Sequence, residues 1–248
     1  MDLVRDLEPL LLATVRVTVF LVLAPPFSHG AIPGTVKAML GVGVAFALSP
    51  ALPAASLSTA AFLGQLLSEA LIGAGLGVLV TLVFAAVQAA GRLIDVFGGF
   101  EMSVAYDPMS MTSGGPFAQL YALTATVLLF VSEGYQLVIG GLARTFDALP
   151  LGATLDLAAL AETMTQSVGQ MFLAALQVAG PLIAVLFLAD VGLGLLTRVA
   201  PALNAFALGF PLKILITLFL GTFAIIALPR VISALADSAV GRLTQVTG

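Results

Sequence analysis

The chain has 248 residues, of which 60% are hydrophobic and 9% are charged, and its formal net charge is −4. A soluble globular domain carries about 25% charged residues, so this chain has too few charges to cover the surface of a soluble enzyme or a disordered regulator. Nucleic-acid binding would need a basic patch, but 13 acidic residues outnumber the 9 Lys and Arg. Long apolar runs replace the alternating pattern of a transmembrane β-barrel. The sequence therefore predicts an all-α membrane protein that contacts lipid and no nucleic acid.

Six apolar segments are predicted as helical spans, at about 20 residues for a full crossing: 10–24, 38–56, 70–91, 117–142, 170–196 and 207–229. Pro181 stands inside the fifth span and Pro211 inside the sixth. Proline removes a backbone donor and kinks a helix, and freed backbone groups survive in a membrane only where protein or water satisfies them. These helices are therefore predicted to be kinked. No repeat or linker divides the chain, so residues 1–248 are predicted to form one domain.

Polar residues recur every three or four positions along the apolar segments, so they form stripes on single helix faces. We predict that the ionisable residues in or beside the stripes make functional contacts: Glu69, Arg92, Asp95, Glu133, Arg144, Asp190, Arg198 and Lys213. Amides extend the stripes at Gln136, Gln166, Gln170 and Gln177. Two interpretations remain open. In the first, the stripes have a function, because they line a hydrated path or meet polar faces of neighbouring subunits. In the second, the polar residues hydrogen-bond or pair with one another within the folded chain. Arg16, alone in the first span, is predicted to be paired or to reach an interface.

The sequence gives little support for an enzymatic activity. His29 is the single histidine and cysteine is absent, so a zinc site would need carboxylates at unusual spacing. A serine nucleophile needs a paired base, and His29 stands in a turn-forming segment. The sequence therefore predicts no catalytic residue, cofactor or metal site, and no enzyme.

Residues 98–116 form a loop rich in turn formers, with Asp107-Pro108 as a turn initiator. Met109 and Met111 stand in its middle, and methionine suits an irregular gap that must sometimes open. On composition alone, an ordinary surface loop is the simpler interpretation.

Three stretches, taken in order, resemble the FliR family of flagellar biosynthetic proteins, also called the FliR/SctT family of type III secretion export gates. The first runs from Arg16 to Pro25 and continues at Ile32-Pro33-Gly34. The second runs from Gly91 to Pro108, and the third from Gly194 to the run Gly-Phe-Pro-Leu-Lys that ends at Lys213. Together they span nearly the whole chain.

The resemblance implies a subunit of the flagellar type III export gate in the bacterial inner membrane, at the flagellar basal body. The family assembles with FliP and FliQ beside FlhA and FlhB, and exported flagellar proteins pass through unfolded as substrates. The implied fold consists of bent helical hairpins, a FliP-like part followed by a FliQ-like part. The family also has a loop that plugs the closed channel, which maps onto Asp107, Pro108, Met109, Ser110, Met111, Thr112, Ser113, Gly114, Gly115 and Pro116.

Three alternatives remain open. An injectisome homologue would export virulence effectors, although the Gly-Phe-Pro-Leu-Lys run favours the flagellar branch. A secondary transporter with broken helices would coordinate an ion or solute through Asp190, Glu133 or Glu69. A scaffold of the basal body would tolerate changes in 107–116. Arg230 and Arg242 follow the last span, which favours a cytoplasmic C-terminus.

Overall fold

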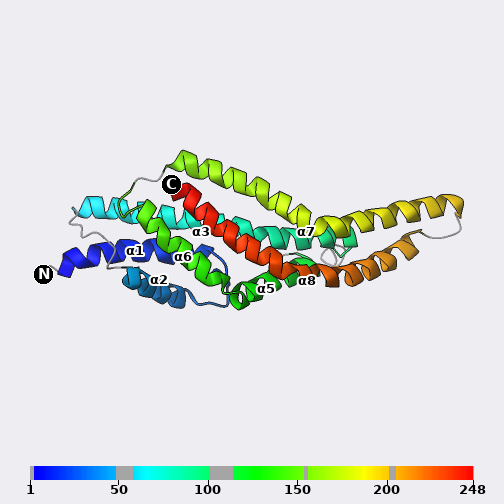
Figure 1. Cartoon of the computed structure of the whole chain (residues 1–248), viewed down its shortest axis with the longest axis horizontal. Helices are drawn as coiled ribbons and strands as arrows, with labels where there is room; N and C mark the ends of the chain where they lie inside the picture. The colour runs from blue at the N-terminus through cyan, green and yellow to red at the C-terminus, as the bar shows by residue number, and fades with distance from the viewer. Residues whose placement is uncertain (1–2, 49–57, 101–113, 154–155, 201–204, 248) are drawn as a thin grey trace. The chain divides into compact units, whose positions relative to one another are not determined.

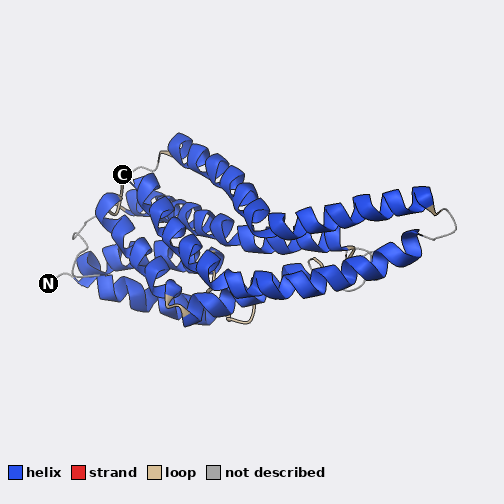
Figure 2. Cartoon of the chain, turned by 45° about the vertical axis from the view of Figure 1, so that its right-hand side comes forward, coloured by secondary structure: helices blue, strands red, loops and turns tan. Residues whose placement is uncertain are grey.

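The computed structural model describes residues 3–48, 58–100, 114–153, 156–200 and 205–247, which are helices joined by short connections (Figures 1 and 2). No strand occurs in these ranges. The helices are α1 (Leu3–Leu23), α2 (Gly34–Leu48), α3 (Thr59–Gly98), α5 (Pro116–Val131), α6 (Gly134–Ala148), α7 (Leu157–Val199) and α8 (Ala205–Thr247). The predicted all-α class is confirmed.

All six predicted apolar segments fall on helices, although residues 49–56 of the second lie outside the described ranges. Within the described residues, three helical stretches are long and apolar enough to cross a membrane, on α3, α7 and α8, or up to four if a bent helix pair counts as one. The predicted count of about six apolar spans by hydropathy is therefore loose as a count of membrane crossings. Because α3 and α7 have 40 and 43 residues, each is longer than the apolar segment that predicted it.

The predicted span 117–142 is broken in the structure. Helices α5 and α6 meet at an angle of 76°, and Glu133 at the break is left-handed, with φ 57°. Gly134 follows, where a Cβ atom would lie 2.6 Å from Leu129 Cδ1, so a larger residue there would require the Leu129 side chain to move. Hydropathy alone missed the break because the residues on both sides are apolar.

The described helices gather into two compact units. The first unit comprises Met1–Val83, Leu129–Val168 and Ser233–Gly248. In its core, α1 packs closely on α3 because Gly73 and Gly77 on α3 lie directly against the α1 backbone. A Cβ at Gly73 would collide with the carbonyl oxygen of Arg16, and one at Gly77 would lie 3.2 Å from that of Phe20. Small residues at this spacing allow helices of a membrane protein to approach.

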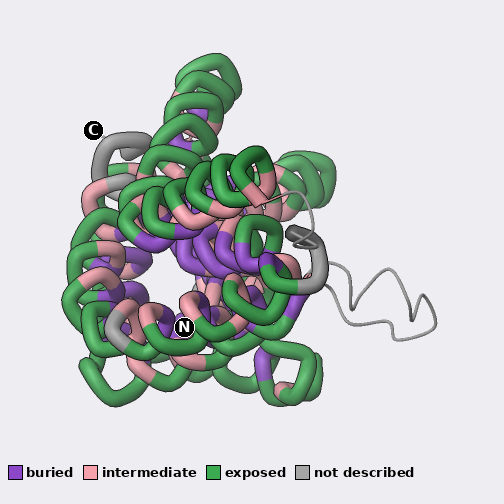
Figure 3. The backbone as a smooth tube through the Cα atoms, turned by 90° about the vertical axis from the view of Figure 1, so that its right-hand side faces the viewer, coloured by how far each residue is buried: buried purple, intermediate pink, exposed green. Residues whose placement is uncertain are grey.

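The second unit comprises Phe84–Leu128 and Gly169–Ile232, and so contains α5 with the adjoining parts of α3, α7 and α8. Gly91 on α3 lies against α5, where a Cβ would come within 2.7 Å of the Phe117 carbonyl oxygen. Only 22% of the most apolar stretch of α7 is buried, against 61% for α3 (burial is mapped in Figure 3). The prediction of one domain over 1–248 stays a prediction.

Candidate functional site

A buried ion pair lies in the first unit, between α1 and α3. Arg16 Nε donates to Glu69 Oε2 at 2.5 Å, and both side chains are fully buried. Arg16 Nη1 also donates to the carbonyl oxygen of Leu149 at 2.8 Å, and the guanidinium carbon lies 4.3 Å from the centre of the Phe146 ring. The backbone N–H of Gly152 donates to Glu69 Oε1 at 3.3 Å. The pair therefore fastens the turn after α6 onto α1 and α3.

The prediction that Arg16 is paired is confirmed. Its partner Glu69 belongs to a predicted polar stripe, so at this position the polar residues satisfy one another inside the chain. Sequence reasoning missed Phe146, Leu149 and Gly152, which complete the cluster. The available signal was the polar stretch that contains Pro150 and Gly152. Turn residues between apolar segments mark a connection, and its backbone groups need hydrogen-bond partners.

A second ion pair joins α7 to α8 in the second unit. Lys213 Nζ lies 2.7 Å from Asp190 Oδ1, and the two side chains are 23% and 46% exposed. Both residues belong to predicted polar contacts, and the structure brings them together. Because both are partly exposed, this pair contributes much less to stability than a fully buried one.

Asp95 near the end of α3 holds the start of α5. Its Oδ1 accepts the backbone N–H of Phe117 at 3.0 Å, and its Oδ2 accepts that of Ala118 at 2.8 Å. The first four N–H groups of a helix have no partner within it, and Pro116 at the first position removes one of them. A carboxylate there also interacts favourably with the helix dipole. Because Asp95 is buried, its carboxylate serves as the hydrogen-bond acceptor for these two N–H groups in place of water.

The residues that flank the predicted plug loop form a tightly packed stem. Phe100 before the loop and Phe117 after it stack edge to face, with ring centres 5.3 Å apart. Gly98 faces Thr217 of α8, where a Cβ would lie 2.8 Å from its hydroxyl oxygen, and Gly115 leaves no room for a Cβ beside the Asp95 carboxylate. Gly114 is left-handed, with φ 108°. These contacts hold the residues on either side of 101–113 to α3, α5 and α8.

Asp107, Pro108, Met109, Ser110, Met111, Thr112 and Ser113 lie outside the described residues. Gly114, Gly115 and Pro116 are the part of the predicted loop that the structure describes. The plug itself therefore stays a prediction, and the structure shows the stem from which it extends.

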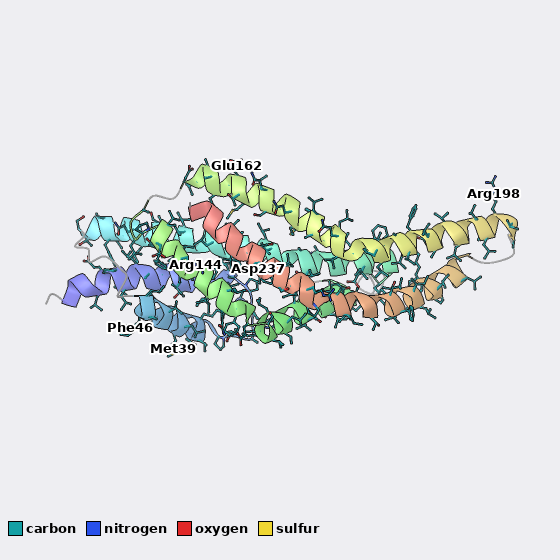
Figure 4. The ribbon with its side chains drawn as sticks, in the orientation of Figure 1. Met39, Phe46, Arg144, Glu162, Arg198 and Asp237 are labelled. Atoms are coloured by element: carbon teal, nitrogen blue, oxygen red, sulfur yellow. The ribbon has the colours of Figure 1, made fainter. Side chains whose placement is uncertain are left out.

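The other predicted ionisable residues lie on exposed surfaces of their helices. Arg92, Glu133, Arg144 and Arg198 are exposed, and Figure 4 shows Arg198 directed outward near the end of α7. Glu162, Gln166, Gln170 and Gln177 are exposed along α7. Their predicted roles in subunit contacts stay predictions. Among the described residues, no three His, Cys, Asp or Glu side chains gather where they could hold a metal ion.

Comparison with known proteins gives one family. Residues 7–239 match the model of the bacterial export proteins, family 1. The chain is 33% identical over 201 residues to the flagellar biosynthetic protein FliR of Escherichia coli K12, covering 80% of this chain and 77% of that protein. It is 32% identical over 219 residues to FliR of Pectobacterium carotovorum, covering 86% and 82%. The secretion system apparatus protein SsaT of Salmonella typhimurium is 29% identical over 158 residues, covering 63% and 61%.

Replacing Arg16 by methionine is expected to destabilise the first unit strongly, because Glu69 would keep a buried charge with no counter-ion. Breaking a buried pair costs about 3–5 kcal/mol, whereas replacing both partners with apolar residues costs much less. The midpoint of thermal unfolding in detergent should therefore fall most for R16M and recover partly in R16M/E69M. The exposed Arg144→Met serves as the control and should leave the midpoint near that of the wild type. A melting curve for R16M that matches the wild type would contradict this role.

Replacing Asp95 by alanine is expected to cost more than the same change at Asp156, which caps α7. Asp156 Oδ1 accepts two backbone N–H groups as well, at 2.9 and 3.1 Å, but it is exposed. Water can satisfy the groups left at Asp156, whereas a buried unsatisfied group costs about 1–3 kcal/mol. Thermal unfolding of D95A, D95N and D156A measures the difference, with D95N intermediate because one acceptor remains. Equal losses for D95A and D156A would show that burial of the Asp95 cap is unimportant.

Proposed function

Because this chain belongs to the bacterial export proteins of family 1, we infer that it is a subunit of the flagellar type III protein export gate in the inner membrane. The observation that carries this function is a family match over residues 7–239, joined to FliR relatives that align over most of the chain. Helices α3 and α7 are long and apolar enough to cross a membrane, which agrees with a location in the inner membrane. Membership of an export-gate family implies association with the type III export apparatus. No catalytic activity is proposed.

In finer detail, we propose that the chain forms the inner-membrane channel together with FliP and FliQ, beside FlhA and FlhB. Unfolded flagellar subunits would pass through this channel as substrates. The incomplete burial of α7 supports the proposal, because large apolar side chains such as Phe172, Phe187 and Leu188 are 63%, 59% and 66% exposed. In the assembled channel, neighbouring subunits would cover these side chains in place of lipid. The exposed Arg230 and the following Arg242 favour a cytoplasmic C-terminus.

An injectisome gate is the second candidate, because proteins of secretion apparatuses also match this chain. The flagellar relatives cover more of the chain at higher identity, which favours the flagellar branch. A secondary transporter is less favoured, because all three of its proposed ligands are paired or exposed, Asp190 through its ion pair with Lys213. Glu69 is paired with Arg16, and Glu133 is exposed at the α5–α6 break.

We propose that the loop of residues 107–116 closes the channel at rest. The packed stem supports this proposal, because a plug must return to one place after each opening. In the second unit, Asp95 holds the start of α5 directly after the loop, and Phe100, which precedes the undescribed residues 101–113, packs against Phe117.

Deleting the gene in its own host is expected to abolish secretion of hook and filament subunits, and swimming with it. Secretion assayed in the culture supernatant measures the effect, and a plasmid copy of the gene should restore it. Where the host also has an injectisome, its effectors should still be secreted. A deletion strain that swims, or one that loses effectors alone, would overturn the flagellar assignment.

Deleting residues 109–115 is expected to make the resting channel leak while the complex still assembles. Ion conductance across the membrane of cells that express the export apparatus measures leakage. A variant with 109–113 replaced by an equally long Gly-Ser segment, which keeps Gly114 and Gly115 of the stem, separates loss of the plug side chains from shortening of the connection. An equally tight resting state in both variants would contradict the plug role.

A further inference from the structure

The hydroxyl group of Tyr121 on α5 is buried without a hydrogen-bond partner. The Tyr121 side chain is 0% exposed, and no group in the described part of the chain bonds to its hydroxyl oxygen. Among the described residues, one other buried side-chain atom shares this condition, Nη2 of Arg16, whose guanidinium is bonded through its other two nitrogens. The Tyr121 side chain has a single polar atom, so nothing compensates for the missing bond.

This unsatisfied hydroxyl carries a free-energy cost that the smaller buried hydroxyls of the chain avoid. A buried phenol O–H usually finds an acceptor, and a buried donor without one has lost its bonds to water and gained none. The buried Thr145 and Thr217 each donate to a carbonyl oxygen of their own helix, at 2.6 and 2.8 Å. Short side chains can reach their own backbone in this way, whereas the phenol oxygen stands too far from it. Tyr121 therefore depends on an acceptor from another element.

Tyr121 belongs to a row of three aromatic rings, Phe100, Phe117 and Tyr121, which we call the aromatic row. The ring centres of Phe117 and Tyr121 are 6.4 Å apart and the rings meet edge to face, as those of Phe100 and Phe117 do. Phe117 also lies against α8, where a Cβ at Gly221 would come within 2.8 Å of Phe117 Cε1. All of these residues lie in the second unit. A change in the packing of the stem therefore changes the surroundings of Tyr121.

The aromatic row couples the Tyr121 hydroxyl to the loop. Phe100 precedes residues 101–113 and Phe117 follows closely after them, so a displacement of the loop acts first on these two rings. The packing in the structure leaves the hydroxyl unsatisfied. A packing in which Phe117 moves away would give the hydroxyl access to an acceptor or to water. The cost of the unsatisfied group therefore falls on the packed stem and not on the loosened one.

We propose that Tyr121 is a gating residue of the export channel, whose unsatisfied hydroxyl destabilises the closed arrangement, in which the stem is packed, relative to the open one. This inference rests on the proposed role of residues 107–116 as a plug. The Asp95 cap and the contact between Phe100 and Phe117 favour the closed arrangement. Tyr121 opposes them, so a substrate needs less binding free energy to shift the channel to the open arrangement.

The test is Tyr121→Phe in the whole apparatus of the host, because it removes the hydroxyl and keeps the ring that packs against Phe117. We expect Y121F to lower secretion of flagellar subunits several-fold at an unchanged amount of assembled complex. We also expect the purified complex to unfold at a higher temperature, since a buried unsatisfied donor is removed. A lower unfolding temperature would overturn the proposal, because the hydroxyl would then have a partner in the closed channel. Secretion at the wild-type rate would overturn it as well.

Tyr135→Phe is the matched control. Tyr135 on α6 is half-buried beside the Phe130 ring, with ring centres 5.6 Å apart, and its hydroxyl oxygen accepts a hydrogen bond from Gln136 Nε2 at 3.3 Å. Y135F therefore removes a hydroxyl that has a partner and lies outside the stem. We expect it to leave secretion unchanged and not to raise the unfolding temperature. An equal loss of secretion in both variants would overturn the proposal, because the effect would then not be specific to the stem.

A second substitution separates gating from a general loss of function. Phe100→Leu weakens the contact with Phe117 and so destabilises the packed stem from the other side. Added to Y121F, it is expected to restore much of the lost secretion, whereas two unrelated defects would add up. Absence of recovery in Y121F/F100L would overturn the proposal.

Failure of the proposed function looks different from failure of this inference. If the chain is no part of the flagellar export gate, the unaltered gene does not restore secretion to the deletion strain. If the plug role alone is wrong, the channel stays tight after residues 109–115 are deleted. Neither result depends on the change at Tyr121.

Discussion

A polar group buried among apolar helices must find a partner on the chain, and the structure of the first unit depends on how Arg16 meets this requirement. Moving an isolated charge out of water costs several kcal/mol per ion. Glu69, the Leu149 carbonyl and the Phe146 ring together surround the guanidinium. The carboxylate in turn receives the Gly152 N–H. One pair of charges thus decides where α1, α3 and the turn after α6 meet.

The second unit meets the same requirement with a carboxylate at a helix start. Asp95 accepts two N–H groups that α5 cannot satisfy itself, and Gly91 and Gly115 make the approach of the chains possible. The same contacts fix the ends of the loop that includes residues 107–113. The plug itself stays a proposal, and the structure shows how Phe100 and Phe117, on either side of residues 101–113, pack against each other.

Local features of the sequence predicted the helices well, because hydropathy depends on neighbouring residues. Each apolar segment falls on a helix, and the cost of a buried charge predicted that Arg16 is paired. The partner could not be predicted, since Glu69 lies 53 positions away and is selected by the approach of α1 to α3 at Gly73 and Gly77. The α5–α6 break was missed because Ser132-Glu133-Gly134 is too short to lower the hydropathy of the segment.

The placement of Asp95 shows a second limit of the sequence. Its stripe predicted a polar contact, but its role as a cap depends on α5 starting beside it, which is a property of the fold. Exposed stripes mark the opposite case. Glu133, Arg144 and Gln177 are exposed in the described part of the chain, so their environment is set by whatever surrounds them.

Some polar groups of the chain have partners within it, and others are exposed. Only the first kind contributes to the stability of the chain by itself. The ion pair and the Asp95 cap each lie within a single unit, so they contribute to folding before any assembly, although the buried Nη2 of Arg16 has no hydrogen-bond partner among the described residues. The large apolar side chains Phe172 and Phe187 of α7 are exposed instead, so a neighbour that covers them would add to the stability of the chain. A partner that binds only the folded chain stabilises it by a free energy that rises with the logarithm of the partner's concentration above its Kd. The stability of this subunit in the membrane is therefore a property of the assembled gate.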